Sequence, residues 1–233
     1  MIDTHCHLLP GLDDGCRDME EALKLARALA RVGVKSIVCT PHFSRRYATD
    51  AEEAGHRLQE LVEAIRAVGI PLSLSLAAEV ASAMATRAPA EALLARRIGS
   101  RHILVELERG TPAPVLNVVL DRIEELGCVP VLAHPERCAA VRNQPRLIDA
   151  ARARGALVQI VAPSLVGRWG REAEGAAWGY VHSGRADLLA SDAHRPGQEG
   201  LHLTPAIALL AQRAGPRRVV ELTMTGPASL LAA

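Results

Sequence analysis

The sequence predicts an α/β fold, a closed (β/α) barrel that is incomplete or distorted, in a single domain over residues 1–233. Short β-rich runs alternate with amphipathic segments of helical periodicity, which indicates a parallel sheet. A chain of 233 residues can bury one core, whereas two domains would each be small. About seven strand-and-helix units, with no early G-x-G-x-x-G motif, favour a barrel over an open doubly wound sheet.

The expected elements follow one another along the chain. Strands are predicted at residues 2–5, 33–40, 72–80, 103–107, 129–133, 156–161 and 187–190. Helices with regular apolar spacing are predicted at residues 18–31, 50–68, 115–126 and 146–154. In a parallel barrel the carboxyl ends of all strands open onto one face, where the active sites of this architecture lie.

Composition excludes several classes of function. Aromatic residues make up only 2% of the chain, so base-stacking platforms for single-stranded nucleic acid are nearly absent. The net charge of +1 gives no field that would draw the protein to nucleic acid or to a membrane. No signal peptide and no apolar run of about 20 residues is present, so we expect a cytoplasmic protein without membrane insertion. Composition leaves open whether it forms a homo-oligomer.

The five cysteines fit neither a disulfide framework nor a structural zinc site. Their number is odd and no C-x-x-C spacing occurs. We expect most of them to be buried thiols, at Cys6, Cys16, Cys39, Cys128 and Cys138.

The first predicted strand ends in a histidine pair. His5 and His7 are two residues apart, so their imidazoles point to the same side of the strand, which is a chelating arrangement. Alone, this pair could arise by chance. The ends of the other strands carry further metal-ligating types, at His42, Glu79, Glu106, His134, Asp192 and His194, and Asp14 follows the first strand.

These residues would bring five imidazoles and four carboxylates into one cavity. Four carboxylates without cations would repel one another and would be costly to desolvate. Two or three divalent cations remove that conflict. A mixed set of histidine and carboxylate ligands without thiolates suits Mn, Fe or Zn.

The motifs that hold these residues resemble the PHP (polymerase and histidinol phosphatase) superfamily, and within it the bacterial capsule-associated tyrosine phosphatases. The opening M-I-D-T-H-C-H-L-L-P-G-L-D-D-G at residues 1–15 is similar to the start of that subgroup. T-P-H at 40–42, A-E-V at 78–80, I-L-V-E at 103–106, H-P-E-R at 134–137 and S-D-A-H at 191–194 follow in the family's order.

The resemblance implies a distorted (β/α)7, TIM-like barrel with a trinuclear site, most simply of manganese. It implies ligand sets of His5, His7, Glu79 and Asp192 for one ion, of Glu79, Glu106 and His134 for a second, and of Asp14, His42 and His194 for the third. Glu79 would bridge two ions. Asp13 and Glu108 are the neighbours most easily confused with Asp14 and Glu106, which match the family's register.

The implied activity is hydrolysis of a phosphomonoester, as a protein-tyrosine phosphatase in capsule or exopolysaccharide control. The partner would be a phosphotyrosine protein, such as the tail of a bacterial tyrosine kinase. The hypothesis is in-line attack on phosphorus by a water made acidic between cations. Arg137 would clamp a nonbridging oxygen or, alternatively, pair with Glu136 or another local carboxylate. His42 or His194 would assist the leaving group.

Two positions depart from the family's pattern. Phe43 stands where a second histidine often follows T-P-H, and Glu199 stands where the subgroup places an arginine. Arg195 could reach the same phosphate in its place. These departures concern phosphotyrosine specificity more than phosphoester hydrolysis.

Three alternatives accompany this hypothesis. Residues 39–45 match the C-x5-R spacing of thiol-dependent phosphatases, but the stretch has no glycine and contains Pro41, which lacks an N–H for phosphate. A second alternative is a phosphatase of the same superfamily acting on histidinol phosphate, a similar small phosphomonoester or a nucleic-acid end. The third is a catalytically silent metal-binding module, which an intact ligand set disfavours.

Overall fold

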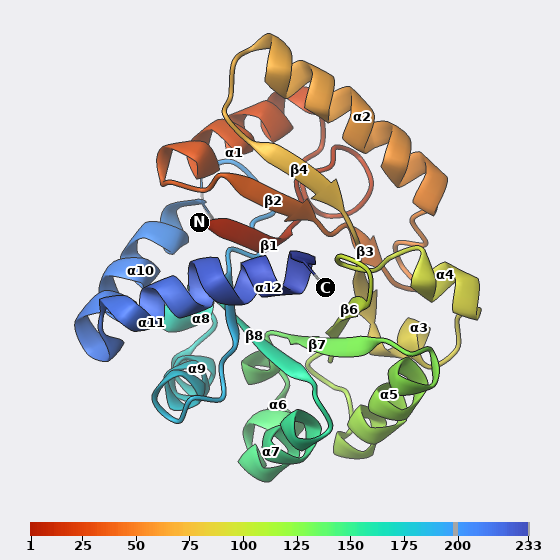
Figure 1. Cartoon of the computed structure of the whole chain (residues 1–233), viewed down its shortest axis with the longest axis vertical. Helices are drawn as coiled ribbons and strands as arrows, with labels where there is room; N and C mark the ends of the chain where they lie inside the picture. The colour runs from red at the N-terminus through yellow and green to blue at the C-terminus, as the bar shows by residue number, and fades with distance from the viewer. Residues whose placement is uncertain (198–199, 233) are drawn as a thin grey trace.

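The strands of the computed structural model, which describes residues 1–197 and 200–232, form two parallel sheets (Figure 1). One sheet has the order β1-β2-β4 and the other the order β3-β5-β6-β7-β8-β9. Every pairing between neighbours is parallel. The strands are β1 (Ile2–Cys6), β2 (Ser36–Cys39), β3 (His42–Phe43), β4 (Ser73–Leu76), β5 (Glu79–Ala81), β6 (His102–Glu106), β7 (Val129–Ala133), β8 (Leu157–Val161) and β9 (Leu188–Ala190).

The two sheets continue into each other at both ends, which confirms the predicted α/β class. At one end the backbone N–H of Glu79 donates to the carbonyl of Pro41 (3.2 Å), where β2 passes into β3 and β4 into β5. At the other end Cys6 and Ala193 form an isolated parallel bridge. The strands thus follow one another around a ring whose ladders are interrupted at two places. The single-domain organisation stays a prediction.

The prediction of one strand over residues 72–80 is wrong. The structure divides this stretch into β4 and β5 because the chain changes its partner there. The ladder with β2 ends at Leu76, whereas the ladder with β6 begins at Glu79. This break brings the side chain of Glu79 to the start of a new strand beside His42.

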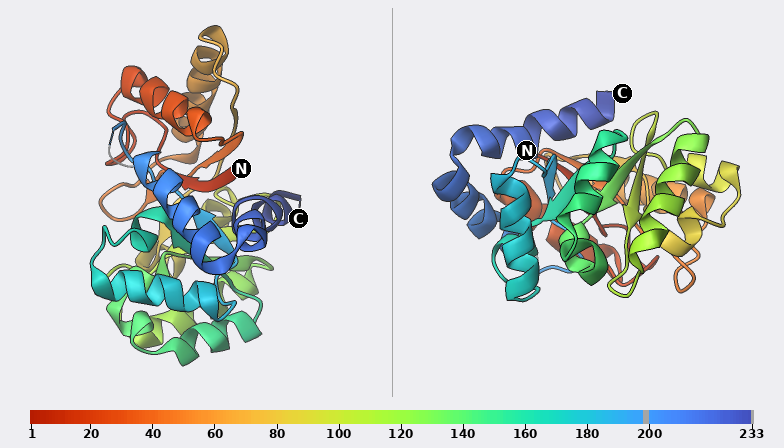
Figure 2. Two further views of the ribbon diagram at one scale, coloured as in Figure 1. Left: turned by 90° about the vertical axis from the view of Figure 1, so that its left-hand side faces the viewer. Right: turned by 90° about the horizontal axis from the view of Figure 1, so that it is seen from below.

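The helices lie on the outside of the ring (Figures 1 and 2). Asp18 caps the first one, accepting a hydrogen bond from the backbone N–H of Glu21 (2.9 Å). Gly33, with φ 95°, follows its end. The helices are α1 (Met19–Arg31), α2 (Ala51–Ala67), α3 (Ser82–Ala85), α4 (Ala90–Leu94), α5 (Ala113–Glu125), the 3₁₀ turn Pro135–Arg137, α6 (Ala139–Arg142), α7 (Pro145–Ala153), α8 (Ala162–Leu165), α9 (Arg171–His182), α10 (Gly200–Ala214), α11 (Pro216–Val220), the π-helical turn Glu221–Thr225 and α12 (Gly226–Ala232).

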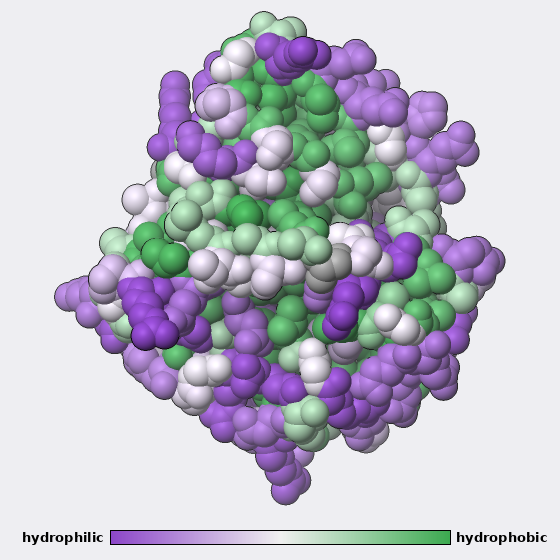
Figure 3. Space-filling view, viewed as in Figure 1, coloured by the Kyte–Doolittle hydropathy of each residue, from purple (hydrophilic) through white to green (hydrophobic). Residues whose placement is uncertain are grey.

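Helix α12 lies across the amino-terminal ends of the strands (Figures 1 and 2). Its Leu230 belongs to a buried cluster with Leu104, Val131 and Leu188 from three different strands. Figure 3 shows this face, with apolar residues toward its middle and hydrophilic ones along the outer helices. The carboxyl ends of the strands therefore form the end of the ring that α12 leaves open. No helix in the described ranges has the length and apolar character needed to cross a membrane.

Candidate metal centre

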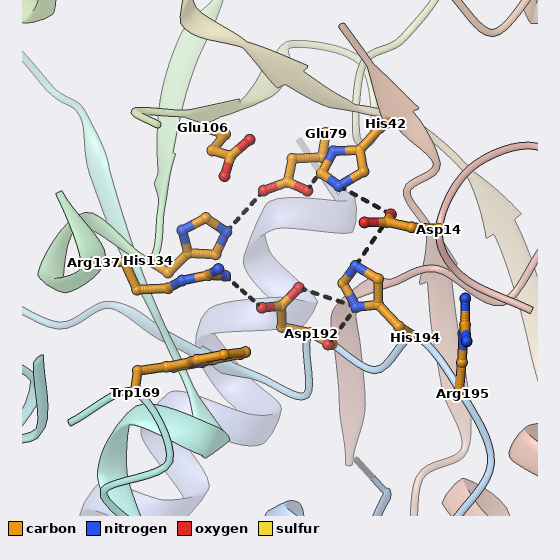
Figure 4. A pocket seen from close by; sticks show the side chains of 10 residues that line it. All are labelled: Asp14, His42, Glu79, Glu106, His134, Arg137, Trp169, Asp192, His194 and Arg195. Atoms are coloured by element: carbon orange, nitrogen blue, oxygen red, sulfur yellow. Dashed lines mark hydrogen bonds and ion pairs between the residues drawn. The ribbon is translucent and has the colours of Figure 1, made fainter. Parts of the chain in front are cut away.

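A cavity of about 500 Å³ lies at the carboxyl ends of the strands (Figure 4). Seven of the nine predicted metal ligands line it, and the other two, His5 and His7, are completely buried. The lining residues are Asp14, His42, Glu79, Glu106, His134, Arg137, Trp169, Asp192, His194 and Arg195. The fold thus brings residues as far apart in sequence as Asp14 and Arg195 around one space.

Two of the lining residues have strained backbone. His134 follows β7 with φ 32°, and Asp192 follows β9 with φ 53°. Side chains other than glycine seldom adopt this left-handed region, and such strain is concentrated at functional sites. Both residues follow the end of a strand, and the side chain of each faces the cavity (Figure 4).

Four side chains present their ligand atoms at mutual distances that suit one cation. The Nε2 atoms of His5 and His7 lie 3.2 Å apart, and each lies 3.2 Å from Glu79 Oε2. Asp192 Oδ1 lies 3.5 Å from His5 Nε2 and 3.7 Å from His7 Nε2. A cation about 2.0–2.2 Å from four tetrahedral donors would hold those donors roughly 3.3–3.6 Å apart. The observed spacing therefore fits a metal ion without rearrangement.

Glu79 lies at the centre of the set. Its Oε2 is 3.2 Å from the nearest nitrogens of His5 and His7 and 3.1 Å from His42 Nδ1. Its Oε1 is 2.8 Å from His134 Nε2. One carboxylate that faces four imidazoles through both oxygens has the placement of a bridging ligand.

At the cavity, two buried carboxylate oxygens lack a hydrogen bond to any described residue. They are Oε2 of Glu79 and Oδ1 of Asp192, the two oxygens that face the imidazoles of His5 and His7. A buried, unpaired anionic oxygen is costly, and a bound cation would compensate it. Without a metal, burial opposes charge on His5, yet the nearby Glu79 and Asp192 carboxylates raise its pKa. The pocket thus favours positive charge at this point.

The loop after β1 holds His7 in one orientation. His7 Nδ1 donates to Asp13 Oδ2 (2.7 Å), which leaves Nε2 to face the cavity. The same carboxylate accepts from the backbone N–H groups of His42 (2.9 Å) and Gly15 (2.8 Å). A Cβ at Gly15 would come within 2.3 Å of the His7 carbonyl oxygen, so the close approach of this loop requires glycine.

His5 is oriented in the same way by a residue that the sequence analysis missed. Its Nδ1 donates to Gln159 Oε1 (2.8 Å), and the amide of Gln159 donates to Thr4 Oγ1 (2.9 Å). All three groups are buried. The sequence feature that could have indicated this role is a lone glutamine among the aliphatic residues of β8, Leu157–Val161.

Asp14 and Asp13 have different positions in the structure. Asp14 Oδ1 lies 3.4 Å from His42 Nε2 and 3.6 Å from His194 Nε2. His194 in turn donates from Nδ1 to the carbonyl of Asp192 (2.9 Å). Asp14 therefore faces the cavity, whereas Asp13 supports the histidine beneath it.

Glu106 and Glu108 are likewise separated. Glu108 accepts hydrogen bonds from Ser82 (2.5 Å) and Thr111 (3.1 Å), away from the cavity. Glu106 lines the cavity and has no ion pair with any described residue. Burial, together with the charge of Glu79, raises the pKa of Glu106 to about 8. A carboxyl group that is aimed into the cavity without a partner is suited to a cation.

The nine side chains fall into three groups that could each hold a metal ion. They are His7, Asp14, His42 and His194; His5, Glu79, His134 and Asp192; and His42, Glu79 and Glu106. The resemblance implied a different partition, in which His134 joins Glu106. In the structure the His134 imidazole instead approaches His5, with ring centres 5.5 Å apart. Which set holds which ion stays a prediction.

Arg137 enters the cavity from the 3₁₀ turn after β7. Its Nη1 donates to Asp192 Oδ2 (3.0 Å), and its guanidinium lies 4.5 Å from the centre of the Trp169 ring. It has no ion pair with Glu136, whose buried carboxylate accepts from the backbone N–H of Val161 (3.2 Å). Trp169 was missed in the sequence, where a tryptophan flanked by Gly167 and Gly170 is the only hint.

The departures from the family's pattern concern Glu199, with Arg195 as its proposed substitute, and Phe43. Arg195 lines the cavity on the side opposite Trp169 (Figure 4). Glu199 lies outside the described residues, so the replacement of the family's arginine by Arg195 stays a prediction. Phe43 is buried, and the guanidinium of Arg96 lies 3.7 Å from the centre of its ring.

The thiol alternative is disfavoured by position. Cys39 is completely buried in β2, and burial raises the pKa of its thiol. Arg45, the arginine of the C-x5-R match, is exposed. A protonated, inaccessible sulfur cannot attack a phosphoryl group.

The comparisons with known proteins agree with this geometry. Residues 1–232 match the model of the family described as capsular polysaccharide synthesis, CpsB/CapC. Tyrosine-protein phosphatase YwqE of Bacillus subtilis is 28% identical over 96% of this chain and 89% of its own length. A putative tyrosine-protein phosphatase, CapC of Staphylococcus aureus, is 31% identical over 83% of this chain and 77% of its own.

Solved structures give the same result. One match comes from the crystal structures of YwqE and of CpsB from Streptococcus pneumoniae, which are described as metal-dependent tyrosine phosphatases. The TM-score is 0.86 at 27% identity, and the match covers 100% of this chain and 94% of that one. A lactonase from Listeria monocytogenes shares the fold alone, with a TM-score of 0.61 at 12% identity over 99% of this chain and 94% of that one. The resemblance found in the sequence is confirmed, and the chain belongs to the CpsB/CapC family.

Proposed function

We propose that the protein is a metal-dependent protein-tyrosine phosphatase that acts in the control of capsular or exopolysaccharide synthesis. The observation that carries the proposal is the convergence of His5, His7, Glu79 and Asp192 at distances that suit a cation, beneath an open cavity. The activity named for YwqE supports phosphotyrosine as the substrate. A phosphorylated bacterial tyrosine kinase is the partner that we propose.

Three divalent cations, most simply Mn²⁺ with Fe or Zn as alternatives, would be held by the nine predicted ligands. These are His5, His7, Asp14, His42, Glu79, Glu106, His134, Asp192 and His194. When bound, such cations neutralise phosphoryl charge and make water acidic enough to act as a nucleophile near neutral pH. Because Glu79 contacts imidazoles of all three groups, we assign it the bridging position.

The catalytic roles of the chain's own residues follow from their positions around the cavity. Arg137 keeps one guanidinium nitrogen on Asp192 and can present others to a nonbridging phosphoryl oxygen. His42 and His194 are the most exposed of the five predicted histidine ligands, with side chains 15% and 21% exposed. We propose that one of them assists the departure of the leaving tyrosine oxygen.

The location that we propose is the cytoplasm. The five cysteines are all free and buried. Thiols that stay unpaired suit a reducing compartment. A cytoplasmic kinase tail would be accessible to the protein there.

The test is substrate preference. Initial rates are measured with a phosphotyrosine peptide, the matched phosphoserine peptide, p-nitrophenyl phosphate and histidinol phosphate, each with added Mn²⁺. We expect the phosphotyrosine peptide to have the highest kcat/KM. A preference for histidinol phosphate would make the protein a small-molecule phosphatase, and no hydrolysis of any substrate would support a silent metal-binding module.

A further inference from the structure

A second cavity of about 230 Å³ lies beside the metal pocket. Arg137 and Trp169 line both spaces, so the two cavities adjoin along these side chains. The remaining lining residues of the second cavity are Arg109, Ala139, Arg142 and Ala173. Three arginines and no acidic residue form its lining, which makes it a site for an anion.

The positive charge of this cavity is only partly compensated. The guanidinium of Arg109 is exposed, lies 5.7 Å from the centre of the Trp169 ring, and has no ion pair with any described residue. Arg142 is paired with Glu172, whose side chain is 80% exposed. The Nε atoms of Arg137 and Arg142 are buried without an acceptor among the described residues. Arg137 is paired with Asp192, so Arg109 supplies the positive charge that the described surroundings of the cavity leave uncompensated.

Arg109 and Arg142, unlike Arg137, do not serve the reacting phosphoryl group directly. Neither Arg109 nor Arg142 lines the metal pocket, whereas Trp169 lines both cavities and its ring centre is 5.7 Å from the Arg109 guanidinium. Trp169 is 36% exposed, with the guanidinium of Arg137 near the face of its indole ring (Figure 4). Cations near an indole are stabilised by its ring electrons, so the arrangement keeps two positive groups next to the mouth of the site.

We propose that the second cavity is a substrate subsite that receives an anionic side chain within three residues of the reacting phosphotyrosine in the substrate sequence. The inference rests on the proposed phosphatase function. The group can be the carboxylate of Asp or Glu or the phosphate of a second phosphotyrosine, because arginines bind both anions. Arg109 is its principal contact, and Arg142 and Trp169 shape the cavity. A substrate with a basic residue at the same position is disfavoured.

The experiment compares phosphotyrosine peptides that differ at one flanking position at a time, from three residues before to three after. Each position carries Ala, Glu, Lys or a non-hydrolysable phosphonate analogue of phosphotyrosine. For wild type we expect kcat/KM at the preferred position to be roughly three- to tenfold higher with Glu than with Lys, the range of one partly exposed ion pair. The phosphonate arm shows whether a second phosphate is bound better than a carboxylate.

The matched variants are Arg109→Glu and Arg101→Glu, which change the net charge equally. Arg101 is exposed and precedes β6 at the opposite end of the barrel. We expect the Glu-to-Lys ratio to fall to about one or to invert in Arg109→Glu, to recover in Arg109→Lys, and to stay at the wild-type value in Arg101→Glu. The effect belongs in KM, because the anion binds away from the reacting atoms.

Two failures are distinguishable. If wild type does not hydrolyse the all-alanine phosphotyrosine peptide, the proposed phosphatase function is wrong. If it does so but shows no preference for an acidic residue at any position, or if Arg109→Glu keeps the wild-type ratio, the subsite is wrong while the phosphatase function stands.

Discussion

The substitution Asp13→Asn tests how the loop after β1 prepares the metal centre. The Asp13 side chain is 1% exposed and receives three hydrogen bonds, from His7 Nδ1, the His42 backbone N–H and the Gly15 backbone N–H. All three partners are donors, and a carboxylate only accepts. Asparagine has one acceptor oxygen, so in either orientation its amide group faces at least one of these donors.

The loss of an acceptor in Asp13→Asn is expected to lower both folding stability and metal affinity. A buried donor that loses its acceptor costs about 1–3 kcal/mol of folding stability. Loss of a carboxylate that orients a ligating histidine lowers metal affinity by roughly 10- to 100-fold, or about 1.4–2.7 kcal/mol. With its Nδ1 partner changed, His7 no longer presents Nε2 to Glu79 in one fixed tautomer. Both effects arise without altering any predicted metal ligand.

The assay is competitive Mn²⁺ titration against a chromophoric chelator, with thermal unfolding of the metal-free protein measured in parallel. Asp149→Asn is the control, because it removes the same charge from an exposed residue paired with Arg185. We expect weaker metal binding and a lower unfolding temperature only in Asp13→Asn. Metal affinity within twofold of wild type in Asp13→Asn would show that Asp13 does not orient His7 for metal binding.

Other predictions concern protons and the nucleophile. The pKa of Glu106 is raised to about 8 without metal, so a cation must displace its proton and Mn²⁺ affinity should rise from pH 6 to pH 8. Calorimetric titration should find a smaller rise in Glu106→Gln. An equal rise in that variant would contradict the role of the Glu106 carboxyl group. Burial raises the pKa of Glu136 to about 7 from its usual 4.5, so the folded state binds the extra proton and stability falls as pH increases between these values, by roughly 3 kcal/mol at most. Urea unfolding of Glu136→Gln should show a smaller fall between pH 5 and pH 8, and a fall as large as that of wild type would exclude this carboxyl as its source. The double variant His5→Ala, His7→Ala should lose both bound metal and phosphatase activity, whereas Cys39→Ser should keep both. An inactive Cys39→Ser variant that retains its metal would support the thiol-dependent mechanism instead.

Much of the site could be predicted from the sequence because strand periodicity is local. Two residues on one strand point to the same side, and His5 and His7 indeed present their Nε2 atoms 3.2 Å apart. The carboxyl ends of parallel strands meet on one face whatever the helices between them do. Residues after β7 and β9, such as His134 and Asp192, could therefore be placed at the same cavity.

The features that the sequence did not predict depend on contacts between distant segments. The break between β4 and β5 arises from a change of pairing partner, which no pattern within residues 72–80 records. The orienting bond from His5 to Gln159 joins residues 154 positions apart. The grouping of ligands around each ion depends on side-chain rotamers, so motif order alone does not determine it.

Metal dependence of the phosphatase activity can be measured by titrating Mn²⁺ into chelator-treated protein while phosphotyrosine-peptide hydrolysis is followed. We predict negligible hydrolysis without metal and a rise that reaches its plateau at two to three equivalents, the number that the three ligand groups can hold. Hydrolysis that survives complete removal of metal, or a metal-loaded protein that leaves phosphotyrosine intact, would contradict the account.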